Sequence, residues 1–149
     1  MRLAALVLAL ALAASACAPR LAPPYRDYEA RTSEAGAPLR DRLADAAREA
    51  GWTVEPSPDP AVVSTAPRRV GTGLWSTTDA ALDLVPLDGG YVRVYVRAER
   101  RSLLGGRSKV YALSPSLRAS ILGSISDALA SRGLVALGTP RDRDEDATD

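Results

Sequence analysis

Residues 80–101 read AALDLVPLDGGYVRVYVRAERR and contain the clearest structural signal in this 149-residue chain. In the second half of this stretch, valines alternate with arginine and tyrosine side chains. A period of two predicts a β-strand with one buried side and one solvent-facing side. The central DGG predicts a tight turn, because glycine tolerates the positive φ that such turns require. We therefore expect two antiparallel strands, at 80–87 and 91–101.

Two amphipathic helices are predicted on either side of this hairpin. Residues 38–50 place leucine and alanine at three- and four-residue steps, and Gly51 follows as a helix terminator. Ser114 and the proline after it form a helix start, and the helix at about 115–132 ends before Gly133. Each helix has one apolar stripe that must be buried against another element.

Shorter β-signals complete the predicted fold. They lie at 52–55, 61–66, 110–113 and, as a short terminal strand or apolar clamp, 134–137, whereas 70–78 could be a loop or the start of the next strand. Helices at both ends of a run of antiparallel strands indicate an α+β fold. We expect an antiparallel sheet of about four to five strands, with both helices packed on one of its faces.

The two tryptophans occupy different sequence contexts. Trp52 follows the glycine that ends the first helix, so we expect it to fold back onto the last helical turn and join the core. Trp75 lies among glycines and hydroxyl side chains, which makes it the better candidate for an exposed aromatic residue. Core packing is still the environment that we expect for Trp75.

The first 17 residues have the organisation of an export signal. One arginine precedes twelve apolar residues at 3–14, which is shorter than the stretch of about 20 residues that crosses a bilayer but typical of a signal peptide. The segment Ala14-Ser15-Ala16-Cys17 then resembles the lipobox of bacterial lipoproteins. An alternative is an ordinary secretory signal cleaved after Ala16, which would leave Cys17 as a free thiol.

The lipoprotein resemblance implies both a modification and a location. In that family the signal peptide is removed before the cysteine, and acyl groups such as palmitate are attached to the thiol and to the new amino group. Cys17 is therefore the expected lipidation site, and several acyl chains hold a protein on a membrane far better than one. Ala18, in place of aspartate, implies the outer membrane of a host that has two membranes. The expected location is the cell envelope, facing the periplasm or the cell surface.

These signals divide the chain into four parts. The predicted boundaries are a signal peptide at 1–16, a lipidated cysteine and flexible tether at 17–37, a single α+β domain at 38–138 and a disordered charged tail at 139–149. The tether prediction rests on three prolines and several charges without an apolar period. Tyr25 and Tyr28 fall inside this predicted tether.

The composition excludes several kinds of chemistry. The chain has no histidine and one cysteine, which excludes histidine-activated nucleophiles, intrachain disulfides and multi-cysteine metal sites. Asp79 and Asp83 could share one face of a strand, but two such acids are ordinary surface groups unless a pocket raises the pKa of one. Residues 105–109 (GGRSK) lack the spacing of a phosphate-binding loop and predict a turn. We expect no enzymatic activity, no cofactor and no metal.

Six basic residues are concentrated on the second strand of the hairpin and the segment after it, with Glu99 as the one acid among them. They are Arg93, Arg97, Arg100, Arg101, Arg107 and Lys109. These residues could form a solvated face that discourages edge-to-edge pairing, contact anionic lipid headgroups, or bind an acidic protein or glycan. An exported chain is not expected to bind nucleic acid.

The element order also resembles a known architecture. An amphipathic helix followed by Gly51-Trp52-Thr53-Val54 is similar to the helix-grip domains of small envelope lipoproteins, including an accessory lipoprotein of the outer-membrane β-barrel assembly machine. Such a resemblance implies fold rather than function. Our hypothesis is a lipid-anchored envelope protein that acts as a binding or accessory domain, with the membrane and an envelope protein as partners. The alternatives are a carrier that holds a small hydrophobic ligand between sheet and helices, and a purely structural role.

Overall fold

The computed structural model describes residues 23–31, 37–110 and 113–141, so the predicted signal peptide, Cys17 and the end of the tail lie outside the described residues. In chain order the elements are β1 (Tyr25–Ala30), α2 (Leu39–Glu49), β2 (Val54–Glu55), β3 (Val63–Thr65), β4 (Arg68–Thr72), β5 (Ser76–Pro86), the 3₁₀ turn η2 (Asp88–Gly90), β6 (Tyr91–Ser102), β7 (Arg107–Val110), α3 (Pro115–Ala130) and β8 (Leu134–Arg141).

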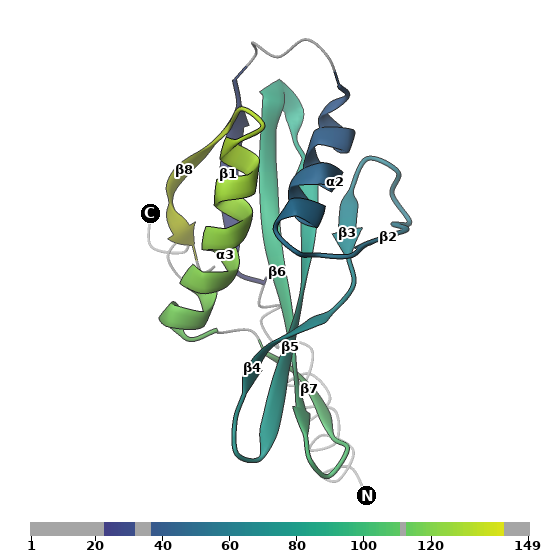
Figure 1. The fold of residues 1–149 in the computed structure, drawn as a ribbon, viewed down its shortest axis with the longest axis vertical. Helices are drawn as coiled ribbons and strands as arrows, with labels where there is room; N and C mark the ends of the chain where they lie inside the picture. Colours follow the sequence, from purple (N-terminus) through teal and green to yellow (C-terminus); the bar gives the residue numbers. More distant parts are fainter. Residues whose placement is uncertain (1–22, 32–36, 111–112, 142–149) are drawn as a thin grey trace, which may run out of the picture.

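The strands form one antiparallel sheet. Six of them follow the order β2-β3-β5-β6-β1-β8, while β4 pairs with the beginning of β5 and β7 pairs with the end of β6. Both helices cover the same face of the sheet (Figure 1). The predicted α+β class, the antiparallel sheet and the two helices on one face are confirmed.

The strand number was wrong, because the described residues contain eight strands rather than four to five. Two of the additional strands, β1 and β4, lie in segments without alternating apolar and polar side chains. Their pairing with the long β5 and β6 strands makes them part of the sheet. Because β-structure depends on the neighbouring strand, such segments carry little signal of their own.

The predicted tether contains a strand in the interior of the sheet. Residues 25–30 form β1, which pairs with β6 on one side and with β8 on the other. Its polar and aromatic residues have structural roles: Asp27 pairs with an arginine of β6, and the side chain of Tyr28 is fully buried. The tether prediction is therefore wrong for this stretch. The prediction of a disordered tail is also wrong for residues 139–141, which belong to β8.

The core fills the space between the sheet and the helices. The inward-facing side chains of β5 and β6 meet those of α3 there, and all are at most 1% exposed: Leu82, Leu84, Val92, Val94, Val96, Leu122, Ile125 and Leu129. The predicted alternation along β6 and the predicted apolar stripe of α3 are confirmed. Burial of these side chains, each contributing about 1.5–3 kcal/mol, is the main force that holds the helices on the sheet.

The helix ends follow the signals in the sequence with one shift. Gly51 and Gly133 adopt positive φ values of 78° and 74° after α2 and α3, as expected for glycines that end helices. Ser114 caps α3 by accepting a hydrogen bond from the backbone N–H of the third residue after it. The helix α2 begins one residue later than predicted, so Pro38 occupies the N-cap position.

The end of α2 is closed by Trp52 and Arg68. The side chain of Trp52 is 2% exposed, and its backbone N–H donates to the carbonyl of Ala47 at 2.9 Å. The Arg68 guanidinium lies 3.7 Å from the centre of the indole ring and donates to the carbonyls of Ala50 and Gly51. Burial lowers the pKa of Arg68. The prediction that Trp52 belongs to the core is confirmed.

Candidate functional site

Three ion pairs run along the helix-free face of the sheet, between arginines of β6 and aspartates of β1 and β5. They are Arg93–Asp27, Arg97–Asp83 and Arg101–Asp79, with nitrogen–oxygen distances of 2.7, 2.5 and 2.9 Å. Each arginine lies on the solvent-facing side of the alternation along β6. The pairs therefore join three strands across a face that no described helix covers.

This arrangement divides the predicted basic patch into two groups. Arg93, Arg97 and Arg101 are neutralised by aspartates. The other three predicted residues, Arg100, Arg107 and Lys109, have no ion pair within the described residues and lie where β6 and β7 form the end of the sheet. The structure thus does not bring the six residues together as one unpaired basic surface.

The predicted acid pair also lies on the helix-free face. Asp83 is held by Arg97, and Asp79 is held by Arg101 with a longer contact of 3.9 Å to Arg69. Each carboxylate thus already has a guanidinium partner. Their evident role is to connect neighbouring strands of the sheet.

An aromatic contact fixes the middle of this face. The rings of Tyr25 and Tyr95 are 5.9 Å apart, and the Arg93 guanidinium lies 4.2 Å from the centre of the Tyr25 ring. Two hydrogen bonds to the carboxylate of Asp27 orient this arginine and raise its pKa. A bidentate pair of this kind fixes the orientation of both side chains. It also joins β1 to β6, the strand that carries Tyr95.

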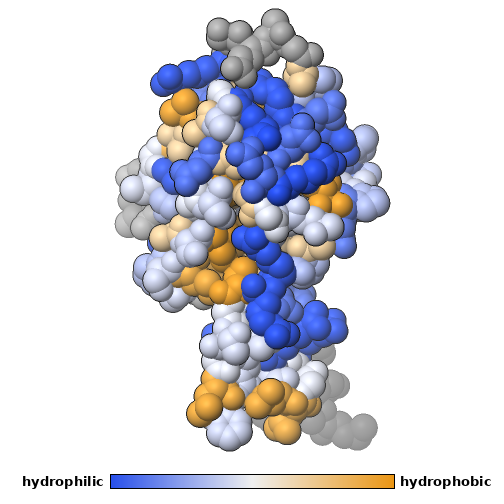
Figure 2. Space-filling model, viewed as in Figure 1, coloured by the Kyte–Doolittle hydropathy of each residue, from blue (hydrophilic) through white to orange (hydrophobic). Residues whose placement is uncertain are grey.

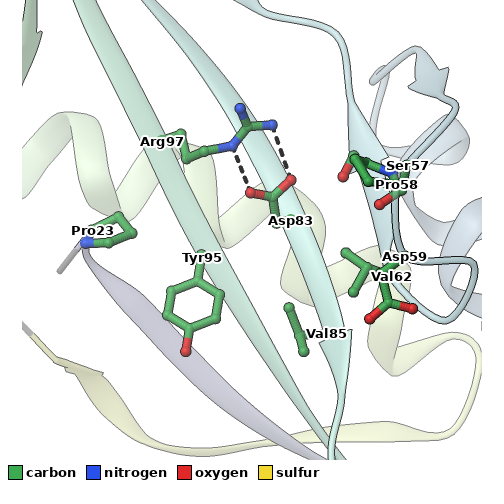
Figure 3. A pocket seen from close by; sticks show the side chains of 10 residues that line it. Pro23, Ser57, Pro58, Asp59, Val62, Asp83, Val85, Tyr95 and Arg97 are labelled. Carbon is green, nitrogen blue, oxygen red and sulfur yellow. Dashed lines mark hydrogen bonds and ion pairs between the residues drawn. The ribbon is translucent and has the colours of Figure 1, made fainter.

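Beside Tyr95 lies a hollow with a volume of about 680 Å³. Figure 3 shows the side chains of Val62, Val85 and Tyr95 around it, with the Arg97–Asp83 ion pair at one edge. The lining is mostly apolar, and its charged groups are this pair and Asp59. We call this surface the sheet-face hollow and define it by six of its lining residues: Asp59, Val62, Asp83, Val85, Tyr95 and Arg97. An apolar surface with a few hydrogen-bonding groups at its edge is the usual composition of a ligand site.

The loop between β2 and β3 forms one wall of the sheet-face hollow. The Asp59 carboxylate accepts a hydrogen bond from the backbone N–H of Ala61 at 2.9 Å, and Arg40 of α2 donates to the carbonyl of Pro60 at 2.8 Å. These bonds tie the proline-rich loop to the domain. One hydrogen bond within the loop and one from α2 therefore hold this wall in place.

The sheet-face hollow was not predicted from the sequence. The alternation along β6 does indicate that Tyr95 and Arg97 face outward, and Val85 is the corresponding apolar position on β5. These outward-facing positions were the signal in the sequence that could have indicated this surface. The place of the 57–62 loop beside them depends on how β3 pairs with β5 and could not be predicted.

A second exposed feature lies at the end of the two hairpins β4–β5 and β6–β7. Trp75, for which core packing was expected, has 73% of its surface exposed. The expectation was wrong because β5 and β6 extend past both helices, so the turns at their ends have no layer to pack against (Figure 1). A reversal of the chain was predicted here, but it is shorter than expected: it occupies residues 103–105, and Arg107–Val110, which overlap the predicted turn at 105–109, already form β7.

Among the described residues, no three side chains that commonly bind metals come together. None of the helices described is both long enough and apolar enough to span a bilayer. Compared with known proteins, the chain matches no family model and no curated protein sequence.

Proposed function

We propose that this chain is a lipid-anchored protein of a bacterial cell envelope that acts by binding another envelope protein. The sheet-face hollow is the observation that carries the binding proposal. It combines an apolar floor with a fixed ion pair on the one broad face that the described helices leave open. Attachment through Cys17 comes from the lipobox resemblance.

The proposed partner is a segment with apolar side chains. Val62, Val85 and the ring of Tyr95 offer apolar surface, whose removal from water favours association by about 25 cal/mol per Å². The Arg97–Asp83 pair provides donors and acceptors at the edge of this surface, with Arg97 about half exposed. Such groups can pair with the backbone of a bound segment and set its direction.

A small apolar ligand is the second candidate occupant. The volume of about 680 Å³ falls in the range of small-molecule sites. The sequence led us to expect a carried ligand between the sheet and the helices, but the buried side chains of the core fill that space. The sheet-face hollow is therefore the position that we propose for such a ligand. Native mass spectrometry of the purified protein distinguishes a retained ligand from an empty hollow.

The first prediction concerns the anchor. Replacement of Cys17 by serine is expected to move the protein from the membrane fraction to the soluble fraction, because the acylated thiol is lost. Mass spectrometry of the mature N-terminal peptide should find acylated Cys17 in the wild type. An unmodified N-terminus together with unchanged fractionation of the variant would exclude the anchor.

The second prediction concerns the hollow. A photo-crosslinking amino acid at Val85 is expected to give a discrete protein adduct in intact cells, because this side chain lies inside the proposed contact. The matched control is the same amino acid at Glu49, an exposed position on α2. The adduct should disappear when Tyr95 is replaced by aspartate. Equal adducts from both positions, or none from Val85, would contradict a partner site in the hollow.

A further inference from the structure

The most exposed large apolar side chains of the described chain gather at one place. Leu74 and Trp75 in the β4–β5 turn are 83% and 73% exposed, and Leu103 and Leu104 in the β6–β7 turn are 69% and 100% exposed. We define these four residues as the hairpin tip. The next such residue, Leu87 at 42%, lies at the opposite end of β5. Figure 2 shows apolar surface at the ends of both hairpins.

The two turns are joined to one another. The backbone N–H of Leu103 donates to the carbonyl of Trp75 at 3.1 Å, and Ser76 lies opposite Ser102 in the β5–β6 register. Within the first turn, the N–H of Gly73 donates to the carbonyl of Ser76 at 2.7 Å. The four apolar side chains therefore sit on a common support. This support projects beyond the helices (Figure 1).

Positive charge lies directly behind the hairpin tip. The segments 69–79 and 99–109 contain five basic residues and two acidic residues. Arg100, Arg107 and Lys109 have no ion pair within the described residues, and Arg107 begins the strand after the second turn. At about 3.4 Å per residue, these three cations lie within about 7–20 Å of the apolar end along their strands.

We propose that the hairpin tip inserts into the surface of an anionic lipid bilayer. Tryptophan and leucine occupy the boundary between headgroups and acyl chains, about 5–10 Å deep, where an apolar body is buried and a polar edge stays wet. The basic residues behind them then lie at the level of the lipid phosphates. The tip is convex and protruding, a shape that penetrates a fluid surface, whereas a protein partner would need a matching cleft.

The length of chain before β1 agrees with this orientation. The carbonyl of Pro24 accepts a hydrogen bond from the N–H of Val96, and Leu103, in the turn just after β6, follows seven residues later, about 24 Å away. Cys17 precedes Pro24 by seven residues, which span at most about 25 Å. An acylated Cys17 can therefore reach the membrane that the hairpin tip contacts. The insertion proposal itself rests on the described residues alone.

Insertion of the hairpin tip would determine the height above the membrane at which the sheet-face hollow meets its partner. Tyr95 of β6 lies eight residues before Leu103 in the following turn, which corresponds to about 27 Å along the strand direction. With the hairpin tip about 5–10 Å deep in the membrane, the hollow is held about 20 Å above the bilayer. The long hairpins then act as a spacer between the lipid and the binding face.

The test uses the mature chain, residues 17–149 with Cys17→Ser, so that neither the apolar residues 3–14 nor an acyl chain contributes to binding. The probes are vesicles of phosphatidylglycerol and phosphatidylcholine, compared with vesicles of phosphatidylcholine alone. Trp52 is buried and Trp75 is exposed, so a shift of tryptophan emission to shorter wavelength on vesicle addition reports on Trp75. We expect this shift with the anionic vesicles, co-sedimentation with them, and loss of the shift in Trp75→Phe.

Two sets of variants measure the apolar and the charged contributions. Leu104→Ser should weaken co-sedimentation by about 10- to 100-fold, the effect of leaving one leucine out of the apolar phase. The triple variant Arg100→Gln, Arg107→Gln and Lys109→Gln should weaken it about 100-fold on anionic vesicles, at about fivefold for each cation. The matched controls, Leu87→Ser and Arg48→Gln, are expected to bind like the parent protein.

Three results would overturn the proposal. They are the absence of both emission shift and co-sedimentation, equal losses in the control variants, and a lipid-free dimer that shields Trp75 and assigns the hairpin tip to a second copy of the chain. The outcome does not depend on the anchor, because Cys17 is replaced throughout. Conversely, failure to find acylated Cys17 would contradict the proposed anchoring and leave the vesicle result unchanged.

Discussion

Replacement of Tyr28 by alanine is expected to lower the free energy of unfolding by about 3–5 kcal/mol, the usual cost of removing a fully buried aromatic side chain. Tyr28 has no exposed surface and lies on the helix-facing side of β1. Its hydroxyl donates to Ser126 of α3 at 2.7 Å, because the Ser126 hydroxyl itself donates to the carbonyl of Leu122. Urea unfolding followed by circular dichroism measures the change.

The matched control is Tyr28→Phe, which keeps the ring and removes the hydroxyl. Its expected cost is about 1 kcal/mol, the value of one hydrogen bond. Burial raises the pKa of Tyr28, with the hydrogen bond to Ser126 opposing this effect, so the phenol is the form that the folded protein accommodates. If Tyr28→Ala unfolded at the same urea concentration as the wild type, residues 25–30 would be the tether that their sequence suggests.

The second large effect is expected for Trp52→Ala, also about 3–5 kcal/mol. The indole fills the junction between the end of α2 and β4, with Arg68 stacked on its ring. Its removal leaves a cavity and also takes away the surface that positions the guanidinium against the end of the helix. The same urea titration measures this loss.

Two further substitutions serve as controls for Trp52→Ala. Trp52→Phe should cost less, because the indole Nε1 has no hydrogen-bond partner in the described part of the structure and no bond is lost. Trp75→Ala should change the free energy of unfolding by no more than about 0.5 kcal/mol, as is usual for an exposed position. Equal destabilisation by Trp52→Ala and Trp75→Ala would contradict the different environments of the two residues.

Together these variants separate stability from binding. The residues of the hairpin tip are exposed, so their replacement should affect membrane contact and leave folding nearly unchanged. Replacement of Tyr28 or Trp52 should instead lower the stability of the fold, because both side chains are buried and lie outside the hairpin tip. A variant of the hairpin tip that loses vesicle binding with an unchanged unfolding transition is thus direct evidence for a surface role.

Elements with strong local patterns were predictable from the sequence. The β5–β6 hairpin, the two helices and the glycines that end them follow from side-chain periodicity and backbone freedom, which act over a few neighbouring residues. By contrast, β1 was missed because its charges and tyrosines have no clear apolar alternation. Asp27 and Tyr28 find their partners on β6 and α3, more than 60 residues away in the chain.

The candidate sites were predictable only in part. The sequence identified the basic residues on β6 and β7 but not their partners, because an aspartate reaches Arg93 or Arg97 only through strand pairing. The sheet-face hollow and the hairpin tip depend on segments separated in the chain, the 57–62 loop with β5 and β6 in one case and two turns in the other.

The sequence by itself determined the α+β class, the two helices and the central hairpin, because periodicity and turn chemistry are local properties of the chain. It is also the sole basis for the expected acylation of Cys17. Only the tertiary structure decided that β1 lies inside the sheet, that half of the basic patch is neutralised, and that Trp75 is exposed while Trp52 is buried. The physical reason is that burial and ion pairing depend on which distant segments meet, and strand register sets those meetings.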